Sequence, residues 1–167
     1  MKKALILGIS GQDGFYLSKL LLEAGYEVLG GARVSTSKAA GALGNRLKKF
    51  CGLDEGDSRL TIVEFDLADV SSLYPLIARF APDEVYNLAA QSHVGASFDN
   101  PSYTLAVNGV AVMDILTLLQ HTGVSSKFYQ ASTSELFGST PPPQTESSPM
   151  VPQSPYAIGK LAAFEAV

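Results

Sequence analysis

The sequence predicts an α/β protein with a doubly wound parallel sheet. Apolar runs of strand type alternate with segments whose apolar residues recur at helical spacing. Gly8, Gly11 and Gly14 fall between the first such strand and the first helix. Alternating strands and helices are typical of βαβ units, whose right-handed crossovers make the strands parallel. We therefore expect the strand order 3-2-1-4-5, with the ligand at the carboxyl ends of the strands.

The first half of the chain is expected to contain, in order, strands over 3–7, 26–32 and 60–65, with helices over 14–24 and from Ser72 onward. Gly25 is the expected C′ residue of the first helix. Ser72 is the expected N-cap of the second, which places Pro75 in the first turn, where its missing N–H costs little. Residues 34–58 are rich in Ser, Gly, Ala and charge, and we expect a loop there with a short helix around 41–50.

The second half is expected to contain, in order, a strand over 84–88, a polar loop over 89–100, a helix over 101–121, a strand over 127–131, a polar loop over 138–154 and a last helix from Pro155. Gly123 would end the long helix. The last helix is still continuing at Val167. Residues 1–167 are thus interpreted as one nucleotide-binding domain.

The glycine spacing G-x-x-G-x-x-G predicts a phosphate-binding loop. Gly8 would allow the tight turn, Gly11 the approach of a pyrophosphate, and Gly14 the close packing of helix on strand. The N–H groups and positive dipole end of the helix would then face the phosphates. The alternative is an ordinary strand-to-helix turn, but such a turn needs only one glycine.

Composition bounds the class of protein. Of the 167 residues, 46% are hydrophobic and 17% charged, which indicates a globular chain with a substantial core. The net charge of −4 and the lack of a basic run argue against a nucleic-acid partner. The single cysteine excludes an internal disulfide and suits a reducing cytoplasm. We expect no signal peptide, no membrane-spanning run and, with two histidines and no Cys/His cluster, no metal site.

Tyr156 and Lys160, four residues apart, would share one face at the start of the last helix. A nearby ammonium favours the phenolate, so the tyrosine could act as general base or acid on a substrate hydroxyl. The alternative is an exposed helix turn, because this spacing is common by chance. A glycine inside a helix costs about 1 kcal/mol relative to alanine, so Gly159 suggests a close approach by another segment.

Polar residues also follow the fourth and fifth strands. Ser132 to Glu135 could present hydroxyls and a carboxylate, or could simply cap a helix or turn. His93, in a loop, and His121, near a helix end, are interpreted as structural residues. The carboxyl ends of the strands also carry Arg33, Asp66-Leu67 and Leu88-Ala89-Ala90.

The glycine and Tyr-x-x-x-Lys motifs resemble those of the extended short-chain dehydrogenase/reductases, which have Rossmann-type folds. Three longer segments, at 11–17, 86–94 and 128–138, together with Ser154-Pro155-Tyr156-Ala157, resemble the GDP-mannose 4,6-dehydratase family. The resemblance covers nearly the whole chain. Members of that family are much longer, so the chain resembles an N-terminal portion that stops before the substrate domain.

The resemblance implies a hydro-lyase that converts GDP-mannose to GDP-4-keto-6-deoxymannose with tightly held NADP. Its implied catalytic residues are Thr133, Ser134, Glu135, Tyr156 and Lys160. Tyr156 would take the C4 hydroxyl proton and Glu135 the C5 proton, while Thr133 and Ser134 would hydrogen-bond the sugar. The implied cofactor-binding residues are Gly8, Ser10, Gly11, Gln12, Asp13, Gly14, Arg33, Asp66, Leu67, Leu88, Ala89, Ala90, Ser92, Tyr156 and Lys160.

Alternatives to this function are an epimerase or reductase on the same scaffold, and a non-catalytic dinucleotide-binding module. Glu135 favours the dehydratase, since the other reactions need no base for C5. Where the family often has two arginines, this chain has Arg33 followed by Val34; Arg33 with Ser35 and Thr36 still favours NADP. The apolar helix from Pro101 and the Tyr156 helix predict a homodimer, or a dimer of dimers, through a four-helix bundle.

Overall fold

A computed structural model describes residues 1–33 and 37–167 of the chain. Its sheet has five strands in the order β3-β2-β1-β4-β5, which confirms the predicted order. The strands are β1 (Lys3–Leu7), β2 (Glu27–Ala32), β3 (Leu60–Glu64), β4 (Glu84–Asn87) and β5 (Lys127–Gln130). β1 pairs in parallel with β2 and β4, and β2 pairs in parallel with β3.

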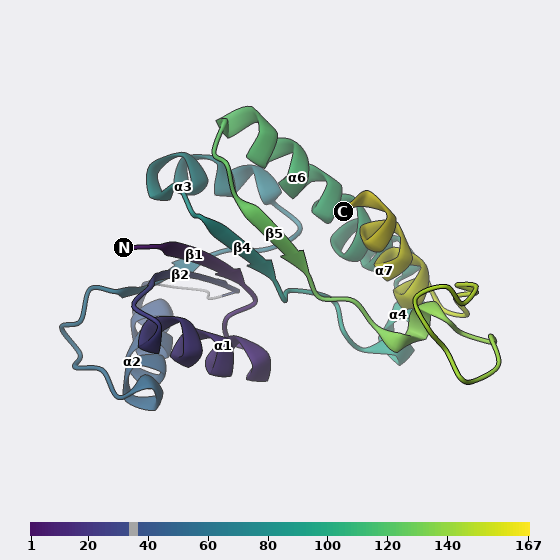
Figure 1. The fold of residues 1–167 in the computed structure, drawn as a ribbon, viewed down its shortest axis with the longest axis horizontal. Coiled ribbons are helices and arrows are strands. Elements are labelled where there is room, and N and C mark those ends of the chain that lie inside the picture. Colours follow the sequence, from purple (N-terminus) through teal and green to yellow (C-terminus); the bar gives the residue numbers. More distant parts are fainter. Residues whose placement is uncertain (34–36) are drawn as a thin grey trace. The chain divides into compact units, whose positions relative to one another are not determined.

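Helices occur where the alternating pattern requires crossovers. They are α1 (Gln12–Glu23), α2 (Ser37–Cys51), α3 (Leu73–Phe80), α4 (Val94–Asp99), α5 (Pro101–Leu105), α6 (Ala111–Thr122) and α7 (Pro155–Ala166). α1 and α2 lie on one face of the sheet and α3 on the other (Figure 1). The fold is therefore the predicted α/β arrangement with a doubly wound parallel sheet.

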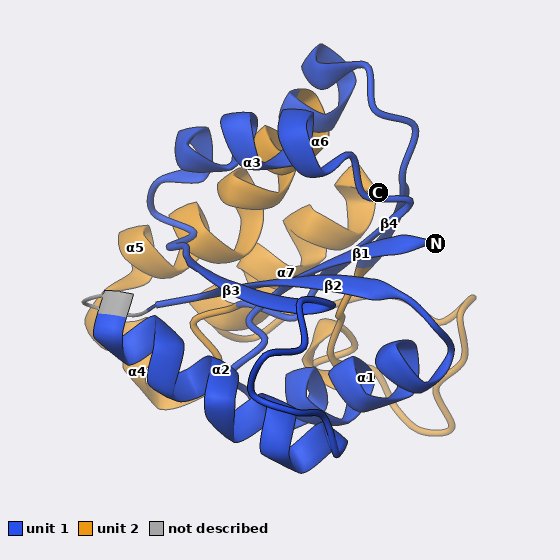
Figure 2. Ribbon diagram, turned by 90° about the vertical axis from the view of Figure 1, so that its left-hand side faces the viewer, with its two compact units in different colours: residues 1–89, 118–129 blue, residues 90–117, 130–167 orange. Residues whose placement is uncertain are grey.

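The chain forms two compact units, coloured separately in Figure 2. Unit 1 comprises residues 1–89 and 118–129, and unit 2 comprises residues 90–117 and 130–167. In unit 1 the central strand is fully buried from Ala4 to Leu7. A parallel strand covered on both faces must be apolar along its whole length, which explains this uninterrupted run.

We expected residues 34–58 to form a loop with a short helix around 41–50. The helix is longer than expected, since α2 takes up most of that segment. Leu43 and Leu47, one helical turn apart, are buried in the unit 1 core. Lys48 and Lys49 lie in the last turn, where cations complement the helix dipole. The small and polar residues between these two leucines weaken the apolar pattern, so the sequence favoured a loop.

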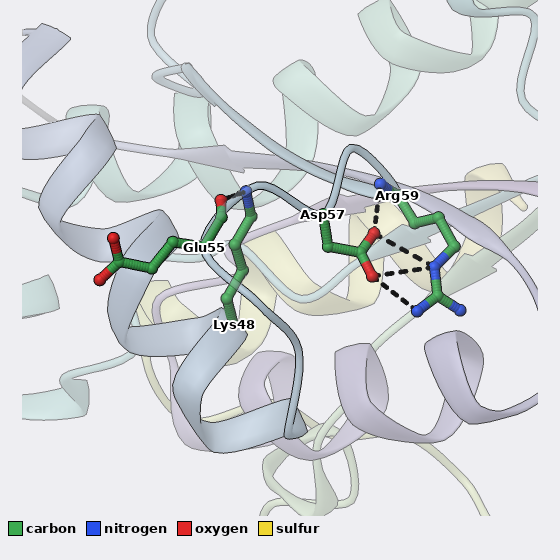
Figure 3. A network of polar contacts seen from close by, with 4 residues as sticks. All are labelled: Lys48, Glu55, Asp57 and Arg59. Carbon is green, nitrogen blue, oxygen red and sulfur yellow. Dashed lines mark hydrogen bonds and ion pairs between the residues drawn. The ribbon is translucent and has the colours of Figure 1, made fainter.

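The loop after α2 is held by two sets of polar contacts (Figure 3). The Lys48 ammonium donates to the Glu55 carbonyl oxygen at 2.6 Å. The Asp57 carboxylate accepts from the Arg59 side chain, with a shortest distance of 2.7 Å, and from the Arg59 backbone N–H. These bonds from Arg59 lower the pKa of Asp57 to about 2. The loop thus leads into β3 through a local ion pair.

Two further expectations need correction. Residues 89–100 are not only a loop: they contain α4, whose first turn is capped by His93 Nδ1 accepting from the Ala96 N–H at 3.0 Å. Ser72 precedes α3 as predicted but does not cap it with its side chain, because its hydroxyl instead donates to the Asp69 carbonyl.

The predicted long helix is a helical segment from Pro101 to Thr122 with a π-helical turn at Ala106–Val110. Gly123 follows it with φ +67°, as expected of a glycine that ends a helix. Contrary to the sequence-based expectation, this segment of 22 residues is long and apolar enough to cross a membrane by length and composition. Core helices of soluble proteins share these properties, and 44% of its most apolar window is buried within the protein.

Candidate functional site

In unit 1 the glycine loop is built as the spacing predicts. Gly8 has φ +84°, and a Cβ there would lie 2.7 Å from the backbone nitrogen of Ala89. A Cβ on Gly14 would lie 2.5 Å from the Ile9 carbonyl oxygen. Both contacts are with backbone atoms, which cannot move aside cheaply. The alternative of a turn with spare glycines is therefore wrong for Gly8 and Gly14.

The start of α1 has the features of an anion site. Its N-cap residue Gly11 has no side chain with which to cap the helix, and its N–H donates to the Gly8 carbonyl oxygen at 3.0 Å. Residues 10–13 (Ser10, Gly11, Gln12 and Asp13) are exposed. The N–H groups of the first turn and the positive end of a helix of 12 residues thus face solvent.

The other predicted cofactor residues of unit 1 follow the strands in register. Leu7 pairs with Gly31 on β2 and with Asn87 on β4, so the carboxyl ends of these strands lie at one edge. The predicted residues that follow at this edge differ in burial. Arg33 is exposed and Leu67 is buried, whereas Asp66, Leu88 and Ala89 are half-buried. Asp66 accepts from the Ala68 N–H at 3.0 Å. Val34, Ser35 and Thr36 lie outside the described residues.

Sequence reasoning missed the two glycines within β2. A Cβ on Gly30 would lie 2.3 Å from the Cδ1 atom of Ile9, so only glycine leaves room for that fully buried side chain. The Gly31 carbonyl accepts from the N–H groups of both Gly8 and Ile9. A glycine inside a strand often marks such a close approach, and the adjacent pair was the available signal.

In unit 2, α7 carries Tyr156 and Lys160. Ser154 caps this helix by accepting from the Ala157 N–H at 3.1 Å, and Pro155 occupies its first turn. Tyr156 is 9% and Lys160 4% exposed, so the alternative of an exposed helix turn is wrong. The Lys160 ammonium donates to the Ala131 carbonyl oxygen, and burial lowers the pKa of Lys160.

The sequence left two interpretations open for the residues after β5, a cap of a helical turn and a set of polar groups for a ligand, and the structure has features of both. Thr133 Oγ1 accepts from the Glu135 N–H at 3.2 Å and caps a short helical turn, Ser134–Leu136. The capping interpretation is therefore confirmed for Thr133, whose hydroxyl can still donate one hydrogen bond. Ser132, Ser134 and Glu135 are exposed. Their polar groups are thus accessible to a ligand.

The remaining predicted site residues also lie in unit 2. Ala90 is half-buried and Ser92 exposed, on the segment that leads from β4 to α4. His93 caps α4, and His121 lies in the last turn of α6, as their interpretation as structural residues required. Within residues 1–33 and 37–167, no group of three His, Cys, Asp or Glu side chains is placed to hold a metal ion.

Another helical segment packs closely against Gly159, as the presence of a glycine inside α7 suggested. A Cβ there would lie 3.0 Å from Asn108 Cβ and 3.4 Å from the Thr104 carbonyl oxygen. Opposite it, a Cβ on Gly109 would lie 3.2 Å from the Gly159 carbonyl oxygen. The two glycines therefore let α7 cross the helix that follows Pro101 at short range.

This contact gives a stability prediction with an internal control. Gly41→Ala, in open space on α2, should stabilise the chain by about 0.5–1 kcal/mol through helix propensity. Gly159→Ala should instead destabilise it by roughly 1 kcal/mol or more, because overpacking outweighs that gain. Urea unfolding of both variants would measure the difference. Equal stabilisation by the two substitutions would contradict the close helix crossing.

Comparisons with known proteins give a consistent picture. A family model described as GDP-mannose 4,6 dehydratase matches residues 5–167. GDP-mannose 4,6-dehydratase from Yersinia enterocolitica is 43% identical over 167 residues, covering 98% of this chain and 44% of the relative. The Homo sapiens protein of that name is 46% identical over 164 residues, covering 96% of this chain and 44% of the relative. The chain thus spans less than half the length of these relatives.

Two solved enzyme structures have the same fold. The UDP-Glc/GlcNAc 4-epimerase of Campylobacter jejuni matches with a TM-score of 0.83 at 26% identity, over 99% of this chain and 47% of its own. The Bordetella bronchiseptica enzyme WbmH, solved in complex with NAD+, matches with a TM-score of 0.76 at 28% identity, over 99% of this chain and 52% of its own.

Proposed function

Because the chain belongs to the GDP-mannose 4,6-dehydratase family, we propose that it supplies the dinucleotide-binding and acid–base residues of a nucleotide-sugar dehydratase that acts on GDP-mannose. The relatives are named for this reaction at 43–46% identity. The observation that carries the proposal is the pair of buried side chains, Tyr156 and Lys160, on a capped helix, with the exposed carboxylate of Glu135 in the same unit.

The proposed cofactor is NADP, held through its phosphates at the start of α1. The start of α1 fits a pyrophosphate, since residues 10–13 are exposed and its N-cap residue Gly11 has no side chain that would stand between the helix end and a ligand. Arg33 would meet the adenosine 2′-phosphate and Asp66 the adenine end. When bound, the nicotinamide would supply the hydride chemistry of the reaction, at C4 and then at C6 of the sugar.

Each acid–base step is assigned to one side chain. Tyr156 would act as a phenolate, which the Lys160 ammonium would stabilise, and would become a neutral phenol on taking the proton of the C4 hydroxyl. Glu135 would remove the C5 proton, which the adjacent ketone acidifies, as water leaves from C6. Thr133 and Ser134 would hydrogen-bond the sugar oxygens. One water is lost and the cofactor is regenerated, so the proposed reaction needs no external oxidant.

The cofactor assignment predicts a preference that one substitution removes. NADPH should bind this chain more tightly than NADH, and Arg33→Ala should abolish the difference while leaving NADH binding unchanged. Each phosphate hydrogen bond from a guanidinium contributes about 1.5–3 kcal/mol, so the expected loss is at least roughly tenfold. Fluorescence titration measures both affinities. Arg79→Ala, which changes an arginine on α3, is the matched control; equal affinities in the unmodified chain would refute the role of Arg33.

The epimerase alternative has one observation in its favour, which is the fold it shares with the Campylobacter jejuni enzyme. An epimerase requires Tyr156 and Lys160 but no base for C5. Glu135, two residues after the capping Thr133 and within the segment that matches the dehydratase model, favours dehydration.

We also propose that unit 2 forms a twofold dimer. Large apolar side chains remain exposed on the helix from Pro101 and on α7, namely Leu105, Val110, Met113, Ile158 and Phe164. A soluble protein seldom exposes so many on neighbouring helices, and packing both helices against their copies would bury them. A four-helix bundle is the simplest arrangement that does so.

Light scattering tests the dimer directly. The unmodified chain should have twice its monomer mass, and Val110→Glu with Ile158→Glu should give a folded monomer, because burying unpaired carboxylates is costly. Tyr74→Glu, on an exposed position of α3, is the control and should remain dimeric. A monomeric unmodified chain that binds no apolar dye would rule out this interface.

A further inference from the structure

The carbonyl oxygen of Ala131 accepts hydrogen bonds from two side chains of unit 2. Ala131 follows β5 directly, and its oxygen accepts from the ammonium of Lys160. The amide nitrogen Nε2 of Gln130 donates to the same oxygen at 2.9 Å. A carbonyl oxygen has two lone pairs, so it can accept from both donors at once. This one oxygen therefore connects the end of β5 to the ammonium on α7.

The nitrogen of the Gln130 amide, and not its oxygen, has to lie at this position. The amide oxygen would place one acceptor against another, whereas the NH2 group carries the hydrogens that a carbonyl accepts. These hydrogens are partially positive, and they share their acceptor with a full positive charge. A positive group near an ammonium disfavours its charged form, so the Gln130 bond weakens the bond between Ala131 and Lys160.

No carboxylate compensates the charge of Lys160. The residue is 4% exposed, and its side chain forms no ion pair with any residue in 1–33 or 37–167. α7 packs against α4, α5, the π-helical turn and the turn Ser134–Leu136. The titratable side chains on these elements and on α7 itself are, besides Lys160, Asp99, Tyr103, Glu135, Tyr156 and Glu165. Burial, rather than one of these groups, lowers the pKa of Lys160. The Ala131 carbonyl is therefore the main polar support of the ammonium.

We propose that Gln130 is a positioning residue, which weakens the hold of the Ala131 carbonyl on the Lys160 ammonium and so leaves that ammonium available to Tyr156. This inference rests on the proposed function, in which the ammonium stabilises the Tyr156 phenolate. Gln130 does not itself touch the substrate or the cofactor in this role; it acts through the Ala131 oxygen. An ammonium has three N–H donors, so two remain for other partners while Ala131 holds one.

The test compares Gln130→Met with Gln153→Met. Methionine has about the length of glutamine but offers no N–H donor. Gln153 is the matched control, because it also lies in unit 2 and its Nε2 atom also donates to a nearby backbone carbonyl, that of Val151, at 3.0 Å. An NMR titration of carbon-labelled lysine, assigned with Lys160→Met, measures the pKa of Lys160 in this chain without a cofactor. Urea unfolding reports general destabilisation, and dehydration by the natural gene product that contains this chain reports the catalytic consequence.

In Gln130→Met the pKa of Lys160 should rise, with a roughly three- to tenfold lower acid dissociation constant, as expected when one neutral hydrogen bond no longer competes for the oxygen. The dehydration rate at neutral pH should fall roughly three- to tenfold, and the alkaline loss of activity should move to higher pH. Gln130→Glu should raise the pKa of Lys160 further, because a carboxylate would then lie beside the ammonium. Gln153→Met should change neither the pKa nor the rate.

An unchanged pKa of Lys160 in Gln130→Met would overturn the shared acceptor, and a raised pKa with an unchanged rate would overturn the positioning role. If Gln130→Met did not fold, an unchanged pKa in Gln130→Glu would overturn the proposal in its place. A normal dehydration rate in Lys160→Met would refute the proposed function of Lys160, while the NMR titration would still decide whether Gln130 competes for the Ala131 oxygen.

Discussion

Replacing Glu135 by glutamine should stop dehydration of GDP-mannose while leaving oxidation at C4 partly intact. Glutamine keeps the size of the side chain but cannot take the C5 proton. Loss of a general base typically lowers a rate by about 10²- to 10⁴-fold. In the natural gene product that contains this chain, the absorbance of reduced nicotinamide should therefore accumulate when GDP-mannose is added.

The matched control for this variant is Glu146→Gln. Glu146 is also an exposed carboxylate of unit 2, but it lies in the polar loop between residues 138 and 154. The control should dehydrate GDP-mannose at the normal rate. Dehydration at the normal rate by Glu135→Gln would show that another group removes the C5 proton.

Lys160→Met should lower the rate of the same reaction by roughly 10²- to 10³-fold, because it removes the ammonium that would stabilise the Tyr156 phenolate. Methionine preserves most of the buried volume of the lysine side chain, so the fold should persist. Burial lowers the pKa of the Lys160 ammonium. In the unmodified protein, activity should therefore fall as the pH rises through that lowered pKa, since the neutral amine no longer stabilises phenolate.

Two variants check this interpretation of Lys160. Lys160→Arg stays charged at all accessible pH values, so whatever activity it retains should lack that alkaline loss. Lys127→Met, which removes an exposed lysine on β5, should have normal activity and a normal pH profile. A normal rate in Lys160→Met would contradict the proposed role.

The sheet could be predicted from the sequence because its signals are local. The buried run from Ala4 to Leu7, the glycines after it and the prolines at helix starts each determine structure within a few residues. α2 was underestimated because its burial rests on Leu43 and Leu47, which reach their partners only in the folded core. α4 was missed because a histidine, which is not a usual capping residue, caps it.

The candidate site was predictable to the extent that motifs mark it. The glycine loop and the Tyr156–Lys160 spacing identified the groups on α1 and α7. The supporting residues could not be predicted in this way: Gly30 matters because Ile9 packs on it, and Gln130 because it shares the Ala131 carbonyl with Lys160, 29 positions after Ala131. Such contacts depend on tertiary packing, and no local sequence pattern marks them.

The fate of a deuterium label tests the central claim most directly. GDP-mannose carrying deuterium at C4 should be incubated with the natural gene product that contains this chain and with oxidised NADP that contains no NADPH. A dehydratase of the proposed kind moves the label within the molecule, so the 4-keto-6-deoxy product should carry one deuterium at C6, seen by mass spectrometry and NMR. A product that still has its C6 hydroxyl, and that carries the deuterium at C4 with inverted configuration, would indicate an epimerase. That result would contradict the proposed function.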